Sequence, residues 1–361
     1  MQPRVKPGIM DIKPYVGGKS RSAGAERVIK LSSNENPYGP SPKAMAAYTQ
    51  ASSHLHRYPD GSAAALREAI ARVYDLNPEQ IVCGAGSDEL IGLLIAAYAG
   101  QGDEVLYPEH AFLMYKIYTL GCGATPVSAP ETDLHADVDA LLGNVSERTR
   151  LVFLANPNNP TGSYLPASEI ARLREGLRED IILVIDGAYA EYMEANDYTD
   201  GAEWVNDTNT VMLRTFSKIY GLPALRVGWG YMPKHIVDVI NRIRSPFNVS
   251  SAAIAAASAA VEDTHYTDEM RTLNNQERSR VSDAVQALGL HVYESHGNFI
   301  LVDFGSDAQA SGANTHMLQQ GIIPREVANY GLPTCLRVSI GTREENDAFL
   351  QALQALKGLA A

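Results

Sequence analysis

The residue with the strongest claim to chemistry in this chain is Lys218, in the segment RTFSKIYGLPALRVGWG (214–230). A loop lysine is usually a solvated charge, but an amine that is held in place forms a Schiff base with a carbonyl compound. Thr215, Ser217 and Arg226 surround it in the sequence and carry the hydroxyl and guanidinium groups that bind an anion. The choice between these two interpretations depends on what other segments place beside the lysine.

Other polar side chains also follow apolar runs. Asp186 comes directly after ILVI (182–185), and Asn159 follows LVFLA (151–155) by a few residues. An aspartate in this place is costly to bury alone, but it stabilises a protonated ring nitrogen. A lysine Schiff base and such an aspartate are what pyridoxal phosphate needs. The turn GAGS (84–87) precedes an apolar helix, whose free N–H groups favour a bound phosphate.

The elements that must position these residues are predicted from the apolar runs. ILVI and LVFLA are continuously apolar, which is typical of parallel strands covered by helices on both faces. Ligands of such sheets bind at the carboxyl ends of the strands. After about residue 265 the strands alternate more, as in a smaller sheet with one open face. We therefore predict an α/β fold with three parts: an N-terminal arm with part of the small domain (1–50), a large cofactor-binding domain (51–265) and a C-terminal small α+β domain (266–361).

Composition excludes several classes of function. A net charge of −12 disfavours nucleic acid as a partner, and no stretch has the length of a membrane span. Three scattered cysteines fit buried thiols in a reducing compartment, which predicts a cytoplasmic protein. The histidines form no metal-binding motif. The turn GAGSDE lacks the third glycine of a dinucleotide fingerprint and does not match the serine-hydrolase pattern G-x-S-x-G.

From LSSNENPYGPSP (31–42) to LRVSIGT (336–342), the order and spacing of the motifs resemble those of fold-type I pyridoxal-phosphate aminotransferases. The resemblance is greatest to the histidinol-phosphate aminotransferases. It implies a mostly parallel sheet between helices in the large domain. It also implies that Lys218 in TFSK forms the Schiff base and moves the proton of the substrate, while Asp186 in DGAY pairs with the pyridine nitrogen.

The resemblance gives further side chains a role toward the cofactor. Tyr189 and Asn159 would hydrogen-bond its phenolic oxygen, and Phe112 would stack on its ring. Its phosphate would be held by Ala85, Gly86, Ser87, Thr215, Ser217 and Arg226. Tyr58 in RYPD would reach the phosphate of a neighbouring subunit, which implies a homodimer with shared sites.

The resemblance also implies substrate contacts, from Tyr38 in NENPYG, Arg325 in IIPREV and Arg337 in LRVSIGT. Guanidinium groups suit bidentate recognition of carboxylate or phosphate. The family usually has Arg-Pro where this chain has Arg325 followed by Glu326. A carboxylate beside an anion-binding arginine would weaken phosphate recognition, so the residues support the reaction class more strongly than the substrate.

The implied reaction is a ping-pong amino transfer from histidinol phosphate to 2-oxoglutarate. Three alternatives stay open at this point. An aromatic amino-acid aminotransferase would prefer phenylalanine or tyrosine as donor. A lyase similar to threonine-phosphate decarboxylase would release carbon dioxide, and a silent pyridoxal-phosphate-binding protein would convert no amine.

Overall fold

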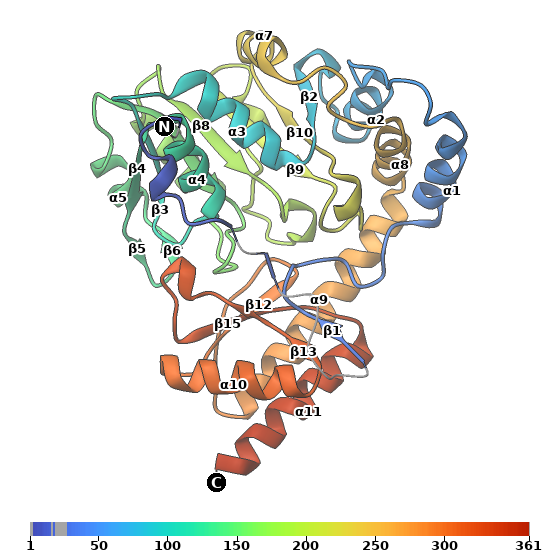
Figure 1. The fold of residues 1–361 in the computed structure, drawn as a ribbon, viewed down its shortest axis with the longest axis vertical. Helices are drawn as coiled ribbons and strands as arrows, with labels where there is room; N and C mark the ends of the chain where they lie inside the picture. The colour runs from blue at the N-terminus through green and yellow to red at the C-terminus, as the bar shows by residue number, and fades with distance from the viewer. Residues whose placement is uncertain (1–2, 16, 19–26, 361) are drawn as a thin grey trace.

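The computed structural model describes residues 3–15, 17–18 and 27–360. The predicted N-terminal arm therefore lies partly outside the described residues, at positions 1–2, 16 and 19–26. Figure 1 shows two unequal layers of structure, with a broad sheet and its helices above and a smaller sheet with three helices below.

The larger sheet has seven strands in the order β2-β10-β9-β8-β7-β3-β4. Adjacent strands pair in parallel except at β10, which is antiparallel to both of its neighbours. The predicted, mostly parallel sheet is thus confirmed. The strands are β2 (Ile81–Gly84), β3 (Glu104–Pro108), β4 (Thr125–Ala129), β7 (Thr149–Ala155), β8 (Ile182–Asp186), β9 (Thr210–Thr215) and β10 (Gly228–Tyr231).

Strand β8 shows why the apolar runs are continuous. Ile182 and Val184 join the core on one face of the sheet, whereas Leu183 and Ile185 join the core on the other. Because side chains alternate between the faces of a strand, two covered faces require every residue to be apolar. The first face is covered by α3 (Ser87–Tyr98), α4 (Leu113–Cys122) and α7 (Lys234–Ile243), and the second by α5 (Val138–Gly143) and α6 (Ala167–Gly176).

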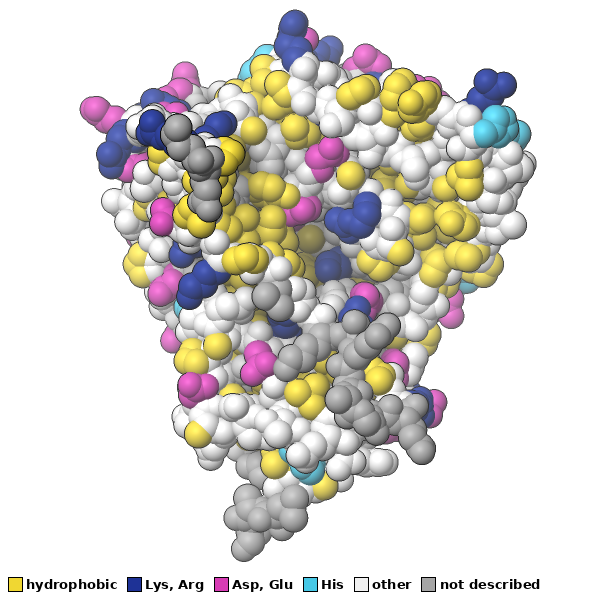
Figure 2. Space-filling model, viewed as in Figure 1, with side chains coloured by type: hydrophobic (Ala, Val, Ile, Leu, Met, Phe, Trp, Pro, Cys, Tyr) yellow, Lys and Arg dark blue, Asp and Glu magenta, His cyan; other side chains and the backbone are white. Residues whose placement is uncertain are grey.

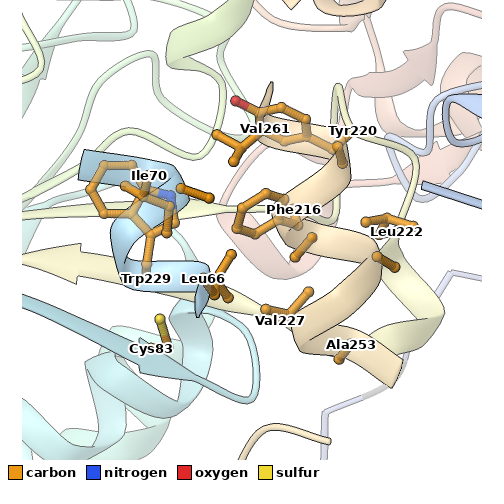
Figure 3. Packing of buried hydrophobic residues seen from close by; sticks show 14 of the residues in the cluster. Leu66, Ile70, Cys83, Phe216, Tyr220, Leu222, Val227, Trp229, Ala253 and Val261 are labelled. Carbon is orange, nitrogen blue, oxygen red and sulfur yellow. The ribbon is translucent and has the colours of Figure 1, made fainter. Parts of the chain in front are cut away.

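A third apolar cluster anchors the loop that carries Lys218. Phe216, Tyr220 and Leu222 are buried against α2 (Ala64–Tyr74) and α8 (Ser251–Glu262), as Figure 3 shows. The Ser250 side chain caps α8, because it accepts a hydrogen bond from the Ala253 N–H. The loop therefore has apolar anchors on both sides of the lysine.

The smaller sheet is antiparallel, in the order β11-β12-β15-β14. Its strands are β11 (His291–Tyr293), β12 (Phe299–Asp303), β14 (Arg325–Glu326) and β15 (Cys335–Ser339), and its helices are α9 (Thr264–Ala287), α10 (Asp307–Gln319) and α11 (Arg343–Ala360). Beside it, β1 (Ile29–Lys30) pairs in parallel with β13 (Ile322–Ile323). The residues just before α1 (Pro42–Ala51) therefore lie next to the small sheet, whereas the 3-10 turn Ile9–Asp11 contacts α4 beside the large sheet (Figure 1).

The three domain boundaries stay a prediction. The boundary at residue 265 falls in the first turn of α9, which continues unbroken for 24 residues. Helix α1 (Pro42–Ala51) packs against α8, beside the large sheet. The remaining short elements are β5 (Glu131–Thr132), β6 (His135–Ala136) and the 3-10 turns Ile9–Asp11, Ser52–His54, Pro78–Gln80, Ala190–Tyr192, Ala202–Trp204, Pro223–Leu225 and Ala328–Tyr330. Among helices of the described residues, none combines the length and apolar character that crossing a bilayer requires.

Phe153 in β7 provides a test of the core. Its side chain is fully buried and stacks on the Tyr115 ring, with the ring centroids 4.6 Å apart. We expect Phe153→Ala to lower the free energy of unfolding by about 3–5 kcal/mol, since removal of a buried ring leaves a cavity. Urea denaturation measures this change. Met10→Ala, at a side chain that is 78% exposed, is the control and should change stability by less than about 0.5 kcal/mol.

Candidate active site

A cavity of about 220 Å³ lies at the carboxyl ends of β7, β8 and β9. Figure 2 shows a hollow in the middle of this face of the molecule, with basic side chains in it. The predicted site residues that line the cavity are Ser87, Phe112, Asn159, Asp186, Tyr189, Thr215, Ser217, Lys218 and Arg226. Parallel pairing explains their convergence, because it brings the ends of strands far apart in sequence to one edge of the sheet.

Lys218 points its amine toward two neighbours from different parts of the chain. Nζ lies 3.4 Å from the carbonyl oxygen of Ser33, to which it donates a hydrogen bond, and 5.6 Å from the centre of the Tyr189 ring. Tyr189 is held in turn by Asn34, whose side-chain amide donates to the phenol oxygen at 2.9 Å. The segment 31–42 thus reaches the cavity through Ser33 and Glu35.

Asp186 ends β8 and is the deepest charged group of the cavity, with 5% of its surface exposed. Its carboxylate accepts hydrogen bonds from the Tyr115 hydroxyl at 2.8 Å and from the Ala188 N–H at 3.2 Å. Burial raises its pKa from 3.8 to about 6, although these hydrogen bonds act in the opposite direction. The nearby Asp88 raises the pKa further and Lys218 lowers it. A cation in the cavity would therefore stabilise the charged form.

The turn between β2 and α3 forms one wall of a candidate anion site. Gly86 has a φ of +84°, and a Cβ at this position would lie 2.7 Å from Nη2 of Arg226. A Cβ on Gly228 would lie 2.2 Å from the backbone nitrogen of Ser87. Only glycine at both positions lets the arginine and β10 approach the helix start this closely. Arg226 also donates to the Ser217 hydroxyl at 3.4 Å, which completes a narrow cradle of N–H, hydroxyl and guanidinium groups.

Ala85 and Gly86 are not among the residues that line the cavity. The N–H of Ala85 donates to Oε2 of Glu89 at 2.6 Å. Gly86 lies at the cradle because of its contact distance to Arg226. A role of these two residues in binding phosphate stays a prediction.

Asp88 is a cavity residue that the sequence did not single out. One carboxylate oxygen accepts a hydrogen bond from Tyr118 at 2.9 Å, and the other is buried with no hydrogen-bond partner among the described residues. Burial raises the pKa of this carboxyl group. Tyr115 and Tyr118 are three positions apart on α4, so one helix face holds both cavity aspartates. The three-residue spacing of Tyr115 and Tyr118 in AFLMYKIY is the sequence signal for this pair of tyrosines.

Two arginines of the small sheet lie near the cavity. Arg325 and Arg337 are directly opposite each other on β14 and β15, and both are buried. Arg337 donates to the side-chain oxygen of Asn159 and, at 2.9 Å, to the carbonyl of Ser32. Burial lowers the pKa of Arg337, while the phenols of Tyr189, Tyr330 and Tyr15 oppose this shift. Tyr15 is a second residue near this site that the sequence did not indicate.

Glu326 follows Arg325 on β14 but is exposed. Successive residues of a strand point to opposite faces of the sheet. Its carboxylate therefore lies on the face away from the one that Arg325 and Arg337 share. Strand alternation thus separates this carboxylate from the two arginines, and its effect on phosphate recognition stays a prediction.

Tyr38 and Tyr58 lie elsewhere. Neither lines the cavity, and their side chains are 41% and 82% exposed. Tyr58 stacks on Phe247 with ring centroids 4.8 Å apart and an interplanar angle of 23°. The substrate role of Tyr38 and the role of Tyr58 toward a neighbouring subunit stay predictions.

The donor set fits pyridoxal phosphate. The glycine cradle has room and donors for a phosphate, Asp186 suits a ring cation, Phe112 offers a flat face and Lys218 offers the amine. The described residues contain no cluster of three or more His, Cys, Asp or Glu side chains that could hold a metal ion.

Comparison with known proteins gives a consistent result. The family "Aminotransferase class I and II" matches residues 26–353. Histidinol-phosphate aminotransferase from Rhodospirillum rubrum is 56% identical over 98% of this chain and 96% of its own length. The same enzyme from Paramagnetospirillum magneticum is 54% identical over 99% of both chains. A crystal structure of histidinol-phosphate aminotransferase from Sinorhizobium meliloti in complex with pyridoxal-5'-phosphate has a TM-score of 0.91 at 30% identity, covering 98% of this chain and 97% of that one.

The raised pKa of Asp186 predicts how stability depends on pH in protein freed of bound small molecules. Between pH 3.8 and about 6 the folded state binds more protons at this carboxyl group than the unfolded state, so the group's contribution to stability falls as pH rises. The loss amounts to about 3 kcal/mol at about 1.4 kcal/mol per pKa unit. An asparagine side chain cannot ionise, so we expect the free energy of unfolding of Asp186→Asn, relative to that of the parent, to be higher at pH 7.5 than at pH 4 by about this amount. Urea denaturation at the two pH values measures it. Asp283→Asn, at an exposed carboxylate, should show no such difference; an equal effect of Asp186→Asn at both pH values would contradict the assignment.

Proposed function

We propose that this chain, which belongs to the class I and II aminotransferase family, transfers the amino group of histidinol phosphate to 2-oxoglutarate with pyridoxal phosphate as its cofactor. The convergence of Lys218, Asp186 and the glycine cradle in one cavity carries the proposal. The relatives named histidinol-phosphate aminotransferase support the choice of donor.

When bound, pyridoxal phosphate supplies a carbonyl that condenses with amines and a ring that stores the electron pair released at carbon. Lys218 provides the amine that holds the cofactor, and its free Nζ then takes the proton from Cα of the substrate. Asp186 would pair with the ring nitrogen, since a cation there would offset the cost of burying the carboxylate. Tyr115 fixes the orientation of that carboxylate.

The cradle and the aromatic wall orient the cofactor. Ser87, Thr215 and Ser217 donate from the helix start and the lysine loop, and Arg226 supplies the positive charge. Phe112, immediately before α4, covers one face of the ring. Donor and acceptor use the same site in turn, which makes the reaction ping-pong.

Arg325 and Arg337 are the proposed anion-binding end of the substrate site. Both reactants carry anions: a phosphate ester on the carbon next to the amino-bearing carbon in histidinol phosphate, and two carboxylates in 2-oxoglutarate, one of them bonded to the keto carbon. Guanidinium groups donate bidentate hydrogen bonds to either anion, and Arg325 and Arg337 are paired directly across the two strands. Asn159 contacts Arg337 and lines the cavity, so it joins this end to the cofactor end.

The proposed assembly is a homodimer in which Tyr58 reaches the cofactor phosphate of the partner. The large side chains that support it are exposed apolar groups on α1 and the two loops next to α2 and α8: Met45, Tyr48, Leu55, Tyr58 and Phe247. Hydrophobic side chains gather on the right flank of the face in Figure 2. Exposed apolar side chains in such a group are typical of an interface. The proposed location is the cytoplasm, where the three free cysteines fit a reducing environment.

A half-reaction panel tests the proposed function. We expect histidinol phosphate to convert the bound cofactor, seen as a change in its visible absorbance, far faster than phenylalanine or tyrosine, and 2-oxoglutarate to reverse the change. Lys218→Ala is the control and should lose both the absorbance of the lysine-linked cofactor and turnover. Preference for phenylalanine would identify an aromatic aminotransferase, release of carbon dioxide would identify a lyase, and no conversion by any amine would identify a silent binder.

The register of β14 gives a second test. Arg325→Gln should raise KM for histidinol phosphate roughly 10- to 100-fold, since a hydrogen bond to a charged group contributes about 1.5–3 kcal/mol. Glu326→Gln, one residue on and on the other face, should leave KM within about threefold of the parent. Steady-state kinetics with saturating 2-oxoglutarate measure both. A large KM effect of Glu326→Gln would show that its carboxylate reaches the substrate after all.

A further inference from the structure

The loop between α7 and α8, residues 244–250, contains a strained residue. Phe247 has a φ of +57°, in the left-handed region that bulky side chains rarely adopt. Strain of this kind persists where surrounding contacts determine the conformation, and it gathers at functional positions. The catalytic argument above gives this loop no role.

Asn248, the next residue, uses its whole side chain to hold the loop. Its amide nitrogen donates to Oε2 of Glu89 at 2.7 Å and to the carbonyl of Cys83 at 3.2 Å. Its side-chain oxygen accepts from Nη1 of Arg244 at 3.1 Å. The two acceptors lie in β2 and in α3, on either side of the connection that carries the glycine cradle.

Glu89 connects Asn248 to the cradle by a shared hydrogen-bond acceptor. The oxygen that accepts from Asn248 also accepts the N–H of Ala85, at 2.6 Å. Ala85 immediately precedes Gly86, whose φ of +84° and contact with Arg226 shape the anion site. A shift of Asn248 would therefore move the Glu89 carboxylate, which holds the Ala85–Gly86 turn.

The other side of the same loop faces the exposed aromatic pair. The Phe247 ring stacks on Tyr58. Arg244 also donates to the carbonyl of Gly61 at 2.7 Å and so ties the loop to the segment that carries Tyr58. The Tyr58–Phe247 stack is at the surface proposed to meet a second copy of the chain. One short loop thus links that surface to the phosphate cradle of its own subunit.

We propose that Asn248 is a positioning residue that couples subunit assembly to cofactor binding, through Glu89 and the Ala85–Gly86 turn. The inference rests on the proposed function, since it needs both the homodimer and the cofactor phosphate in the cradle. Docking of a second copy against Tyr58 and Phe247 fixes the loop, and the fixed loop holds the cradle in its binding geometry. Pairing of the subunits thus increases the affinity for pyridoxal phosphate. By linkage, each bound pyridoxal phosphate increases the affinity of the subunits for each other by the same factor.

The experiment measures the dissociation constant of the subunit pair with and without saturating pyridoxal phosphate, by sedimentation of fluorescently labelled protein. The Tyr58→Phe background removes the hydroxyl proposed to touch the partner's phosphate and keeps the ring stack. In this background the cofactor should tighten the pair by roughly 5- to 150-fold, the usual range for coupled sites. Adding Asn248→Ala should reduce this ratio to less than about threefold.

A purely local weakening of the cradle predicts a different result, because cofactor affinity would fall equally in single subunits and in pairs. The ratio of the two dissociation constants would then be unchanged, and the proposal would be overturned. Asn248→Asp is a second variant of the same shape that keeps the acceptor for Arg244 and loses the donor to Glu89, so it should also lose the coupling. Far-UV circular dichroism shows that each variant is folded.

Asn241→Ala is the matched control. This asparagine also accepts a hydrogen bond from Arg244, at 2.8 Å, but it is exposed and its amide is not bonded to Glu89. It should keep the coupling ratio of the background. A background protein that neither pairs nor binds the cofactor would defeat the proposed function itself, whereas one that does both with a ratio near one would overturn only the coupling.

Discussion

The buried carboxylate of Asp186 is the constraint on which the site depends. A charge at the end of β8 with 5% exposure is expensive unless other groups stabilise it. Tyr115 and Ala188 supply two hydrogen bonds, and still its pKa is raised to about 6. The site is thus incomplete in electrostatic terms until a cation enters the cavity. This gives a physical reason for a cofactor that carries a protonated ring nitrogen.

Apolar packing positions Lys218, the proposed Schiff-base residue. Phe216, Ile219, Tyr220 and Leu222 are all buried, so the residues around Lys218 are anchored while its amine reaches the cavity. A fixed loop lowers the entropy that must be lost when the reacting atoms are aligned. The same residues close the core between the sheet and helices α2 and α8. The same buried residues therefore stabilise the large layer and orient Lys218.

The small sheet contributes the other end of the site and depends on the start of the chain. Pairing of β1 with β13 places the following residues, Ser32 to Asn34, between the two layers. Ser32 accepts from Arg337, the Ser33 carbonyl accepts from Lys218, and Asn34 holds Tyr189. Three consecutive residues thus connect the proposed anion-binding end with the reactive lysine. Any movement between the layers would alter these contacts together.

The sequence by itself determined the mostly parallel sheet and the positions of Lys218, Asp186 and the glycine turn, because each is encoded by a local pattern at the end of an apolar run. Tertiary structure alone decided which groups support them. Tyr115, Asp88 and Asn34 were not indicated, since their partners lie 30 to 155 residues away in sequence and meet only through packing. Glu326 shows the same limit. Adjacent to Arg325 in the chain, it points to the opposite face because a strand alternates its side chains, and only the paired register of β14 with β15 showed which face holds the arginines.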